Sequence, residues 1–192
     1  MYYPLILFGM KPLKVYLCDL THETVVLVSD AIPINIGYVG SYAKKIHRDL
    51  IEISLFKYPN TVIDAIKKNP PDVLGLSNYS WNSLLSERIA NIAKLKNPKV
   101  VTIQGGPNFP HDTEQQLEFL TKRPNTDLHI MFEGEATFSN LLDRVLKNRE
   151  GEQKLLDTPI GGCVFIHPDK QKGLVKGSKP PRIRFLDDIP SP

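Results

Sequence analysis

Hydrophobic positions along the chain fall into short apolar blocks that alternate with longer stretches of helical spacing. The block 72–77 (Asp-Val-Leu-Gly-Leu-Ser) has four successive positions without a polar side chain, 73–76, which is typical of a strand buried on both sides. In residues 136–147, by contrast, Phe138 and Leu142 are one helical turn apart. The pattern predicts strands over 14–19, 50–57, 72–77, 99–104 and 127–132, a short extended piece over 24–28, and helices over 37–48, 61–68, 81–95, 113–121 and 136–147.

Strands that alternate with helices of this length predict a parallel sheet covered by helices on both faces. Right-handed crossovers make such a sheet doubly wound, and a closed barrel would need eight strands. We therefore expect an α/β fold with a flavodoxin- or Rossmann-like, five-stranded parallel sheet in the order 2-1-3-4-5, with strand 50–57 at an edge.

The pattern changes after residue 149. Residues 162–167 and 173–176 flank a polar turn and predict a β-hairpin. The proline-containing end of the chain is typical of a linker. We expect residues 1–150 to form the α/β domain, and residues 151–192 to form a β-hairpin extension and a linker.

Composition and charge exclude several function classes. Hydrophobic residues make up 41% of the chain and charged residues 23%, as in a globular protein. A net charge of +3 and the absence of a Lys/Arg run argue against nucleic-acid binding, and no apolar stretch is long enough to span a bilayer. The apolar opening, residues 1–10, lacks the basic leader of a signal peptide and is interpreted as a short strand or a packing arm.

The cysteine and histidine patterns assign no catalytic or metal-ligating residue to this chain. Cys18 and Cys163 form neither a disulfide framework nor a CxxC motif, which suits a reducing cytoplasm. No cysteine triplet is present that would bind an iron–sulfur cluster. The histidines are scattered: we expect His129 to be packed in the core, whereas His22 lies on a loop from which it could reach a ligand.

The loops that follow the strands carry the candidate binding residues, because open parallel sheets bind ligands at the carboxyl ends of their strands. Gly105, Gly106 and Pro107 directly follow strand 99–104. Two glycines allow a flat ligand or a phosphate to approach the backbone, although a tight turn would also explain them.

A second polar group follows strand 72–77. Ser77, Asn78 and Tyr79 supply a hydroxyl, an amide and an aromatic ring that can bond to or stack on a heterocycle. Ser80 or Asn82 would also suit the N-cap of the next helix, and Trp81 could equally belong to the core. Farther along, Glu133, Gly134 and Glu135 precede a helix, where the helix dipole alone explains the carboxylates.

Four stretches of the chain, taken in order, resemble the cobalamin (B12)-binding domain that precedes the radical-SAM domain in B12-dependent radical-SAM proteins. They are 71–77 (Pro-Asp-Val-Leu-Gly-Leu-Ser), 104–107 (Gln-Gly-Gly-Pro), 132–138 (Phe-Glu-Gly-Glu-Ala-Thr-Phe) and 186–192 (Leu-Asp-Asp-Ile-Pro-Ser-Pro). The last resembles the usual lead-in to the radical-SAM barrel. The resemblance covers nearly the whole chain.

The general pattern of cobalamin-binding domains is DxHxxG, then SxL, then GG. Ser77-Asn78-Tyr79 stands in place of SxL, Gly105-Gly106 in place of GG, and Gly37 in place of the motif glycine. This register puts Ile32 and Ile34 where the aspartate and the cobalt-binding histidine belong. Many radical-SAM relatives also lack that histidine, so the resemblance implies a base-off cofactor without a histidine lower ligand.

The resemblance implies where the cofactor would lie. The corrin would lie over Ile34, Asn35 and Ile36, and the nucleotide tail would enter the groove beside Ser77, Asn78, Tyr79 and the twin glycines; Pro107, Glu133 and Gly134 complete the expected site. S-adenosylmethionine and a [4Fe-4S] cluster would belong to a radical-SAM domain beyond this chain, its expected partner, with methyl transfer as the implied chemistry.

Other ligands of the same fold are disfavoured by the loops. The loop after the first strand is not the phosphate loop of a flavodoxin and lacks the GxGxxG of dinucleotide binding, and Ser77 occupies the place of a response-regulator aspartate. The alternative is a cobalamin-type fold that has lost its cofactor and serves as a substrate- or protein-interaction module.

Overall fold

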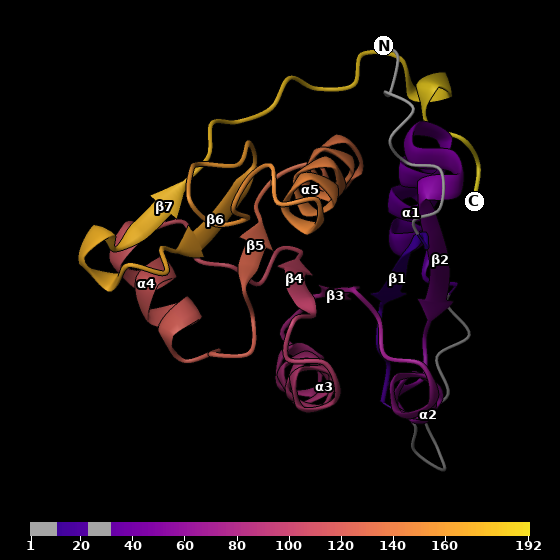
Figure 1. Cartoon of the computed structure of the whole chain (residues 1–192), viewed down its shortest axis with the longest axis horizontal. Coiled ribbons are helices and arrows are strands. Elements are labelled where there is room, and N and C mark those ends of the chain that lie inside the picture. Colours follow the sequence, from indigo (N-terminus) through magenta and orange to yellow (C-terminus); the bar gives the residue numbers. More distant parts are fainter. Residues whose placement is uncertain (1–10, 23–31) are drawn as a thin grey trace.

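A computed structural model describes residues 11–22 and 32–192 (Figure 1). The described residues form one sheet in the order β2-β1-β3-β4-β5-β6-β7. Its strands are β1 (Leu13–Cys18), β2 (Ile51–Phe56), β3 (Val73–Ser77), β4 (Val101–Gly105), β5 (Leu128–Ile130), β6 (Cys163–Ile166) and β7 (Leu174–Lys176). The helices are α1 (Ile34–His47), α2 (Pro59–Lys68), α3 (Ser83–Lys96), α4 (Thr113–Thr121) and α5 (Gly134–Arg149), with short 3-10 turns η2 (Arg48–Leu50), η3 (Lys170–Lys172) and η4 (Leu186–Asp188).

Strands β1 to β5 are parallel and follow the order 2-1-3-4-5, with β2 at the edge, which confirms the predicted topology. The expected five strands need a correction, because the hairpin continues the same sheet: β6 pairs antiparallel with β5, and β7 with β6. The physical reason is burial, since Cys163 and Phe165 of β6 are fully enclosed in the main core. The domain division at residue 150 stays a prediction, and the expectations for residues 1–10 and 24–28 lie outside the described residues.

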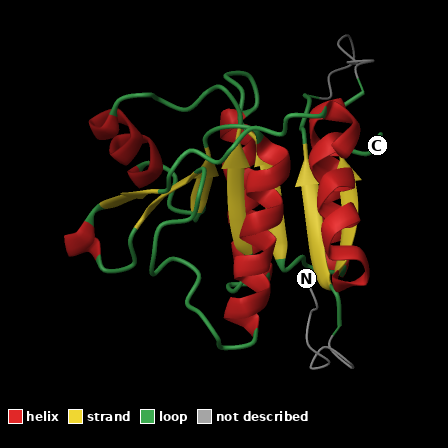
Figure 2. Cartoon of the chain, turned by 90° about the horizontal axis from the view of Figure 1, so that it is seen from above, coloured by secondary structure: helices red, strands yellow, loops and turns green. Residues whose placement is uncertain are grey.

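The two faces of the sheet are covered by different helices. Helices α1 and α5 lie on one side of the strands and α2 and α3 on the other (Figure 1), and the strands run side by side behind the helices in Figure 2. In β1, Val15 and Leu17 point into the core under α1 and α5, whereas Tyr16 points into the core under α2 and α3. This alternation follows from the two-residue period of a strand.

Local sequence signals set where some of the helices begin. Helix α2 starts at Pro59, whose missing N–H has no partner to lose in a first turn. Helix α4 starts after Asp112, whose carboxylate accepts hydrogen bonds from the backbone N–H groups of Glu114 and Gln115. These starts fix the lengths of the loops at the carboxyl ends of the strands.

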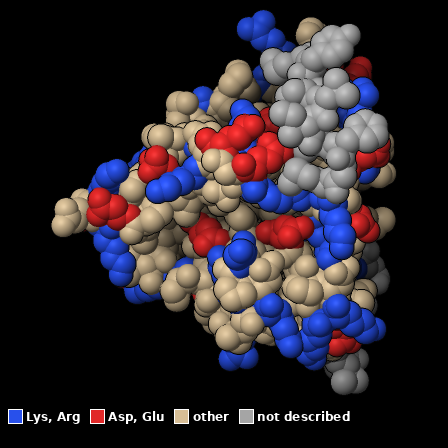
Figure 3. Space-filling view, in the orientation of Figure 1, with Lys and Arg blue, Asp and Glu red and all other residues tan. Residues whose placement is uncertain are grey.

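The C-terminal segment, residues 177–192, returns from β7 past α5 to α1 (Figure 1). Arg182 forms an exposed ion pair with Glu133 at 2.9 Å, and Lys45 donates a hydrogen bond to the Asp188 carbonyl at 2.6 Å. Figure 3 shows basic and acidic side chains interspersed over this face of the molecule. Within residues 11–22 and 32–192, no helix is long and apolar enough to cross a membrane.

Candidate ligand-binding cleft

A cleft opens where β1, β3, β4 and β5 end and where α1 and α5 begin. Its volume is about 240 Å³, which suits part of a ligand rather than a whole corrin ring. It is lined by Leu17, Asn35, Ile36, Val39, Gly75, Leu76, Ser77, Tyr79, Ile103, Gly105, Gly106, Ile130, Phe132, Gly134, Glu135 and Phe138.

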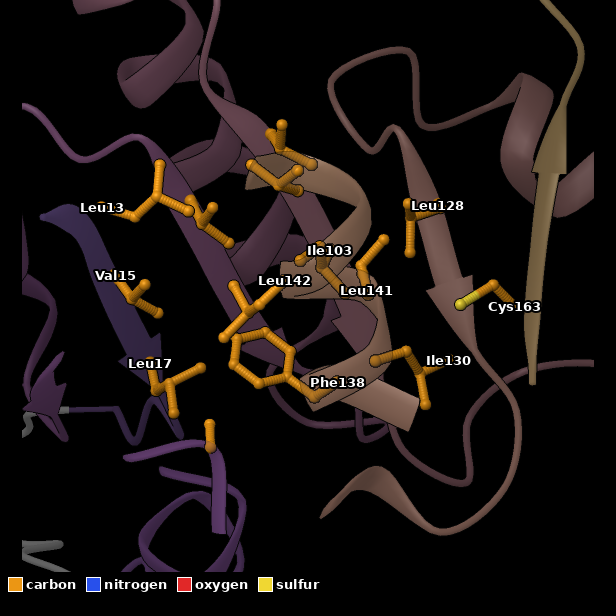
Figure 4. Close-up of a cluster of buried hydrophobic side chains, with 14 of the residues drawn as sticks. Leu13, Val15, Leu17, Ile103, Leu128, Ile130, Phe138, Leu141, Leu142 and Cys163 are labelled. Atoms are coloured by element: carbon orange, nitrogen blue, oxygen red, sulfur yellow. The ribbon is translucent and has the colours of Figure 1, made fainter. Parts of the chain in front are cut away.

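Strand register arranges the sheet side of the cleft in two rows. The deeper row runs across the sheet through Leu17, Gly75 and Ile103. The row nearer the mouth runs through Ser77, Gly105 and Ile130. Figure 4 shows the deep apolar side chains, with Phe138 of α5 beside them. Each row therefore contains one glycine on the face that α1 and α5 cover.

Three glycines at the cleft have different physical roles. A Cβ atom at Gly75 would lie 2.7 Å from Leu17 Cδ2, so Leu17 already fills the space beside it. A Cβ atom at Gly106 would lie 2.7 Å from the Asn78 carbonyl oxygen, and the backbone there has a φ of +133°. At Gly105 the nearest atom would be Ile130 Cβ at 3.7 Å, an ordinary contact. Of these three glycines, only Gly105 has room for a Cβ atom without a clash, and it lines the cleft.

The Ser77 hydroxyl belongs to a buried hydrogen-bond network. It donates to Asp19 Oδ1 at 2.5 Å and accepts from Asn82 Nδ2 at 2.9 Å. The Asn82 amide also donates to the Leu20 carbonyl, and its Oδ1 accepts from the Tyr79 backbone N–H. Asn82 thus ties the loop after β1 to the loop after β3, and its side chain does not cap α3.

Asn78 holds the loop after β3 against the loop after β4. Its backbone N–H donates to the Gly105 carbonyl at 2.7 Å, and its carbonyl accepts from the Asn108 N–H at 3.2 Å. Its side-chain amide also donates to His129 Nε2 at 3.4 Å. Because Asn78 is fully buried, it holds the two loops together and does not offer a surface to a ligand.

His129 is packed in the core, as predicted. It is fully buried, and its ring stacks on Phe109 with centroids 3.9 Å apart. Burial lowers its pKa to about 3, so the ring is neutral. Burial also raises the pKa of Cys163 to about 12 and that of Cys18 still further, so neither thiol is a nucleophile.

Polar and aromatic groups gather at the mouth. The Asn35 amide donates to the Tyr79 hydroxyl at 3.3 Å, which joins α1 to the loop after β3. The Tyr79 ring stacks on Trp81 with centroids 4.5 Å apart. Trp81 is 61% exposed and so lies outside the core. His22 Nε2 donates to the Trp81 carbonyl at 2.8 Å, which commits that nitrogen to the loop.

Of the residues expected at the site, six line the cleft: Asn35, Ser77, Tyr79, Gly105, Gly106 and Gly134. The other five, Ile34, Gly37, Asn78, Pro107 and Glu133, do not. Gly37 packs against Pro192, Pro107 lines a neighbouring hollow, Ile34 is exposed at the start of α1, and Glu133 is paired with Arg182. Contact of any of the eleven with a cofactor stays a prediction.

Sequence reasoning missed the apolar part of the cleft. Leu17, Ile103 and Ile130 were recognised as strand residues, but nothing in the pattern showed that they share a cleft. Gly75, inside an apolar strand, was the available signal, since a glycine there often marks a close approach of neighbouring groups.

Comparison with known proteins gives a consistent picture. The model of the family described as B12 binding domain matches residues 24–142, more than half of the chain. The cobalamin-dependent radical SAM methyltransferase TokK of Streptomyces tokunonensis is 28% identical over 166 residues, which cover 84% of this chain and 23% of that protein. An uncharacterized methyltransferase of Pyrococcus horikoshii is 30% identical over 166 residues, covering 83% of this chain and 33% of that protein. This chain spans a third or less of the length of these relatives.

The fold has a solved counterpart. The cobalamin-dependent S-adenosylmethionine radical enzyme OxsB, with aqua-cobalamin and S-adenosylmethionine bound, superposes with a TM-score of 0.67 over 95% of this chain and 24% of that one. At 19% identity this match concerns the fold alone.

Proposed function

The chain belongs to the B12-binding domain family, and from this premise we propose that it binds cobalamin as the corrinoid-carrying domain of a radical-SAM enzyme of the methyltransferase class. The observation that carries the proposal is Gly105, which lines the cleft and has room for a Cβ atom. A glycine whose side chain could be present without a clash, and yet is absent, suits a ligand that passes over the backbone there.

The residues of the cleft fit the nucleotide tail of the cofactor. Leu17, Ile103 and Phe138 form an apolar floor, and Tyr79 brings a hydroxyl to the mouth. The Asp19–Ser77–Asn82 network holds the loop after β3 in place, so its polar groups are preorganised before a ligand arrives. The corrin ring, too large for the cleft, would lie outside it over the start of α1.

The cofactor would be base-off and without a histidine lower ligand. Ile34, in the register position of the usual histidine, is exposed at the first turn of α1 and has no atom that binds cobalt. His22 uses its Nε2 in a hydrogen bond to the Trp81 carbonyl. When bound, cobalamin supplies the cobalt centre that carries a methyl group.

The rest of the reaction would belong to another domain. The relatives are three or more times longer than the matched region, and two are described as methyltransferases. We infer that S-adenosylmethionine and the [4Fe-4S] cluster bind to a radical-SAM domain C-terminal to this chain, which is its partner. The exposed side chains of Ile32, Ile34 and Trp81 around the mouth suit a surface that such a domain and the corrin would cover.

Reconstitution tests the proposal. The chain is incubated with hydroxocobalamin, desalted and examined by visible absorption; we expect a retained corrin band with a base-off shape. A colourless protein would instead favour an interaction module that has lost the cofactor.

A glycine pair provides the matched control. We expect Gly105→Val to abolish retention of the corrin band while the circular dichroism of the sheet persists, because the added side chain would project into the cleft. Gly161→Val should bind normally, since a Cβ atom there lies 3.7 Å from its nearest neighbour and Gly161 is not among the residues that line the cleft. Normal binding by Gly105→Val would contradict the assigned path of the tail.

A further inference from the structure

The chemistry of the cleft differs between its floor and its mouth. The deeper row, Leu17, Gly75 and Ile103, has no polar side-chain atom, and Phe138 and Ile130 close the cleft beside it (Figure 4). No Lys or Arg is among the described residues that line it. A group that reaches the floor therefore meets only hydrocarbon side chains.

Of the polar side chains that line the cleft, Ser77 and Asn35 are already bonded within the protein, whereas Tyr79 and Glu135 belong to its mouth. The Ser77 hydroxyl donates to Asp19 and accepts from Asn82. Asn35 uses its amide on Tyr79 and its Oδ1 on the Ile36 N–H. Redirecting any of them to a ligand would break a bond within the protein, so they contribute little to recognition of a polar base at the floor.

The nucleotide tail of corrinoids ends in a base whose chemistry varies. Benzimidazole bases carry only hydrocarbon groups on the ring edge that would enter the cleft first. Purine bases carry an exocyclic amine and extra ring nitrogens. A purine on this floor would lose its hydrogen bonds to water without replacement, and that loss is the usual source of strong discrimination.

We propose that this cleft selects corrinoids with an apolar, benzimidazole-type lower base over those with a purine base. The inference rests on the proposed function and adds the class of corrinoid that the chain takes. The selecting residues are Leu17, Ile103 and Ile130, which act by offering no partner to polar atoms of the base.

Three ligands test the proposal on the full chain. They are hydroxocobalamin, the corresponding cobamide with adenine as the lower base, and cobinamide, which lacks the nucleotide. Dissociation constants come from titrations followed by visible absorption. We expect the adenine cobamide and cobinamide each to bind at least about tenfold more weakly than hydroxocobalamin.

Two isosteric variants isolate the polar term. Ile130→Thr and Ile130→Val have nearly the same shape, and only the threonine carries a hydroxyl. Ile130 lies beside Gly105, with its Cβ atom 3.7 Å from where a side chain at that glycine would begin. We expect the ratio of the adenine-cobamide dissociation constant to that of hydroxocobalamin to be about threefold or more smaller for Ile130→Thr than for Ile130→Val. Thermal unfolding of both variants checks that they are folded.

The outcomes separate the two proposals. Equal affinity for the benzimidazole and adenine cobamides would overturn the selectivity while leaving cobalamin binding in place. Cobinamide binding as tightly as hydroxocobalamin would show that no base enters the cleft, and would overturn it as well. Binding of none of the three would overturn the proposed function together with the inference. The selectivity would be supported if Ile130→Val keeps the preference for the benzimidazole base and Ile130→Thr reduces it.

Discussion

The two faces of the sheet are both lined by apolar side chains, but they differ in how completely these side chains fill the space beneath the helices. Under α2 and α3, the side chains of Leu74, Leu76 and Ile89 fill the space between strand and helix. Under α1 and α5, the rows nearest the carboxyl ends each contain a glycine, and Gly105 has room for a Cβ atom. Both faces hold a packed core, and the α1/α5 face also leaves a place for a ligand near the ends of its strands. Variants on each face test this difference.

The largest expected effect lies on the α2/α3 face. Leu74→Ala should lower the free energy of unfolding by about 3 kcal/mol, because the fully buried side chain leaves a cavity. Urea denaturation measures the loss. Leu95→Ala is the control, since Leu95 is 75% exposed and its change should cost less than about 0.5 kcal/mol. Corrinoid affinity of the folded Leu74→Ala protein should be unchanged, and a loss of affinity would show that the faces are not independent.

The second effect separates the twin glycines of the α1/α5 face. Gly106→Ala should lower the free energy of unfolding by roughly 2 kcal/mol, because its Cβ atom would meet the Asn78 carbonyl at a positive φ. Gly105→Ala has room for the methyl group and should stay within about 1 kcal/mol of the parent. Urea denaturation midpoints of the two variants, measured under the same conditions, compare the two losses of stability. Equal losses would mean that both glycines serve only the turn.

The third effect concerns acid, and it is the smallest when expressed per pH unit. The His129 pKa is lowered to about 3 by burial, with a further contribution from Arg123, whereas an unfolded histidine titrates near 6.5. Between these two values the unfolded chain binds the additional proton, so stability falls as the pH drops below about 6.5. This group should contribute a loss of about 1.4 kcal/mol for each pH unit between pH 6 and pH 4.

A phenylalanine variant isolates that contribution. His129→Phe keeps a ring to stack on Phe109 but cannot titrate, so its urea midpoint should depend less steeply on pH than that of the parent. Its stability at neutral pH should also fall, since the Asn78 amide loses an acceptor. The informative quantity is the slope, and identical slopes would mean that His129 does not control the acid response.

Much of the fold could be predicted because it depends on local pattern. Apolar blocks such as 72–77 and helix-spaced positions such as Phe138 and Leu142 set the elements, and the right-handed crossover restricts how parallel strands are ordered. The hairpin was recognised from its turn, but its place in the sheet was not. Its pairing with β5 depends on which edge remains open after the helices have packed.

The site divides in the same way. Residue types and spacing identified Ser77 and Tyr79 and the glycines Gly105 and Gly106, since polar residues and glycines that follow a predicted strand can be recognised from the sequence. The difference between the two glycines appears only in the folded chain, where a Cβ atom would clash with the Asn78 carbonyl at Gly106 and would make ordinary contacts at Gly105. The fold also brings Leu17, Ile103 and Ile130, from three different strands, to the same cleft. Such distinctions depend on atoms that are distant along the chain, and strand register alone brings them within contact distance.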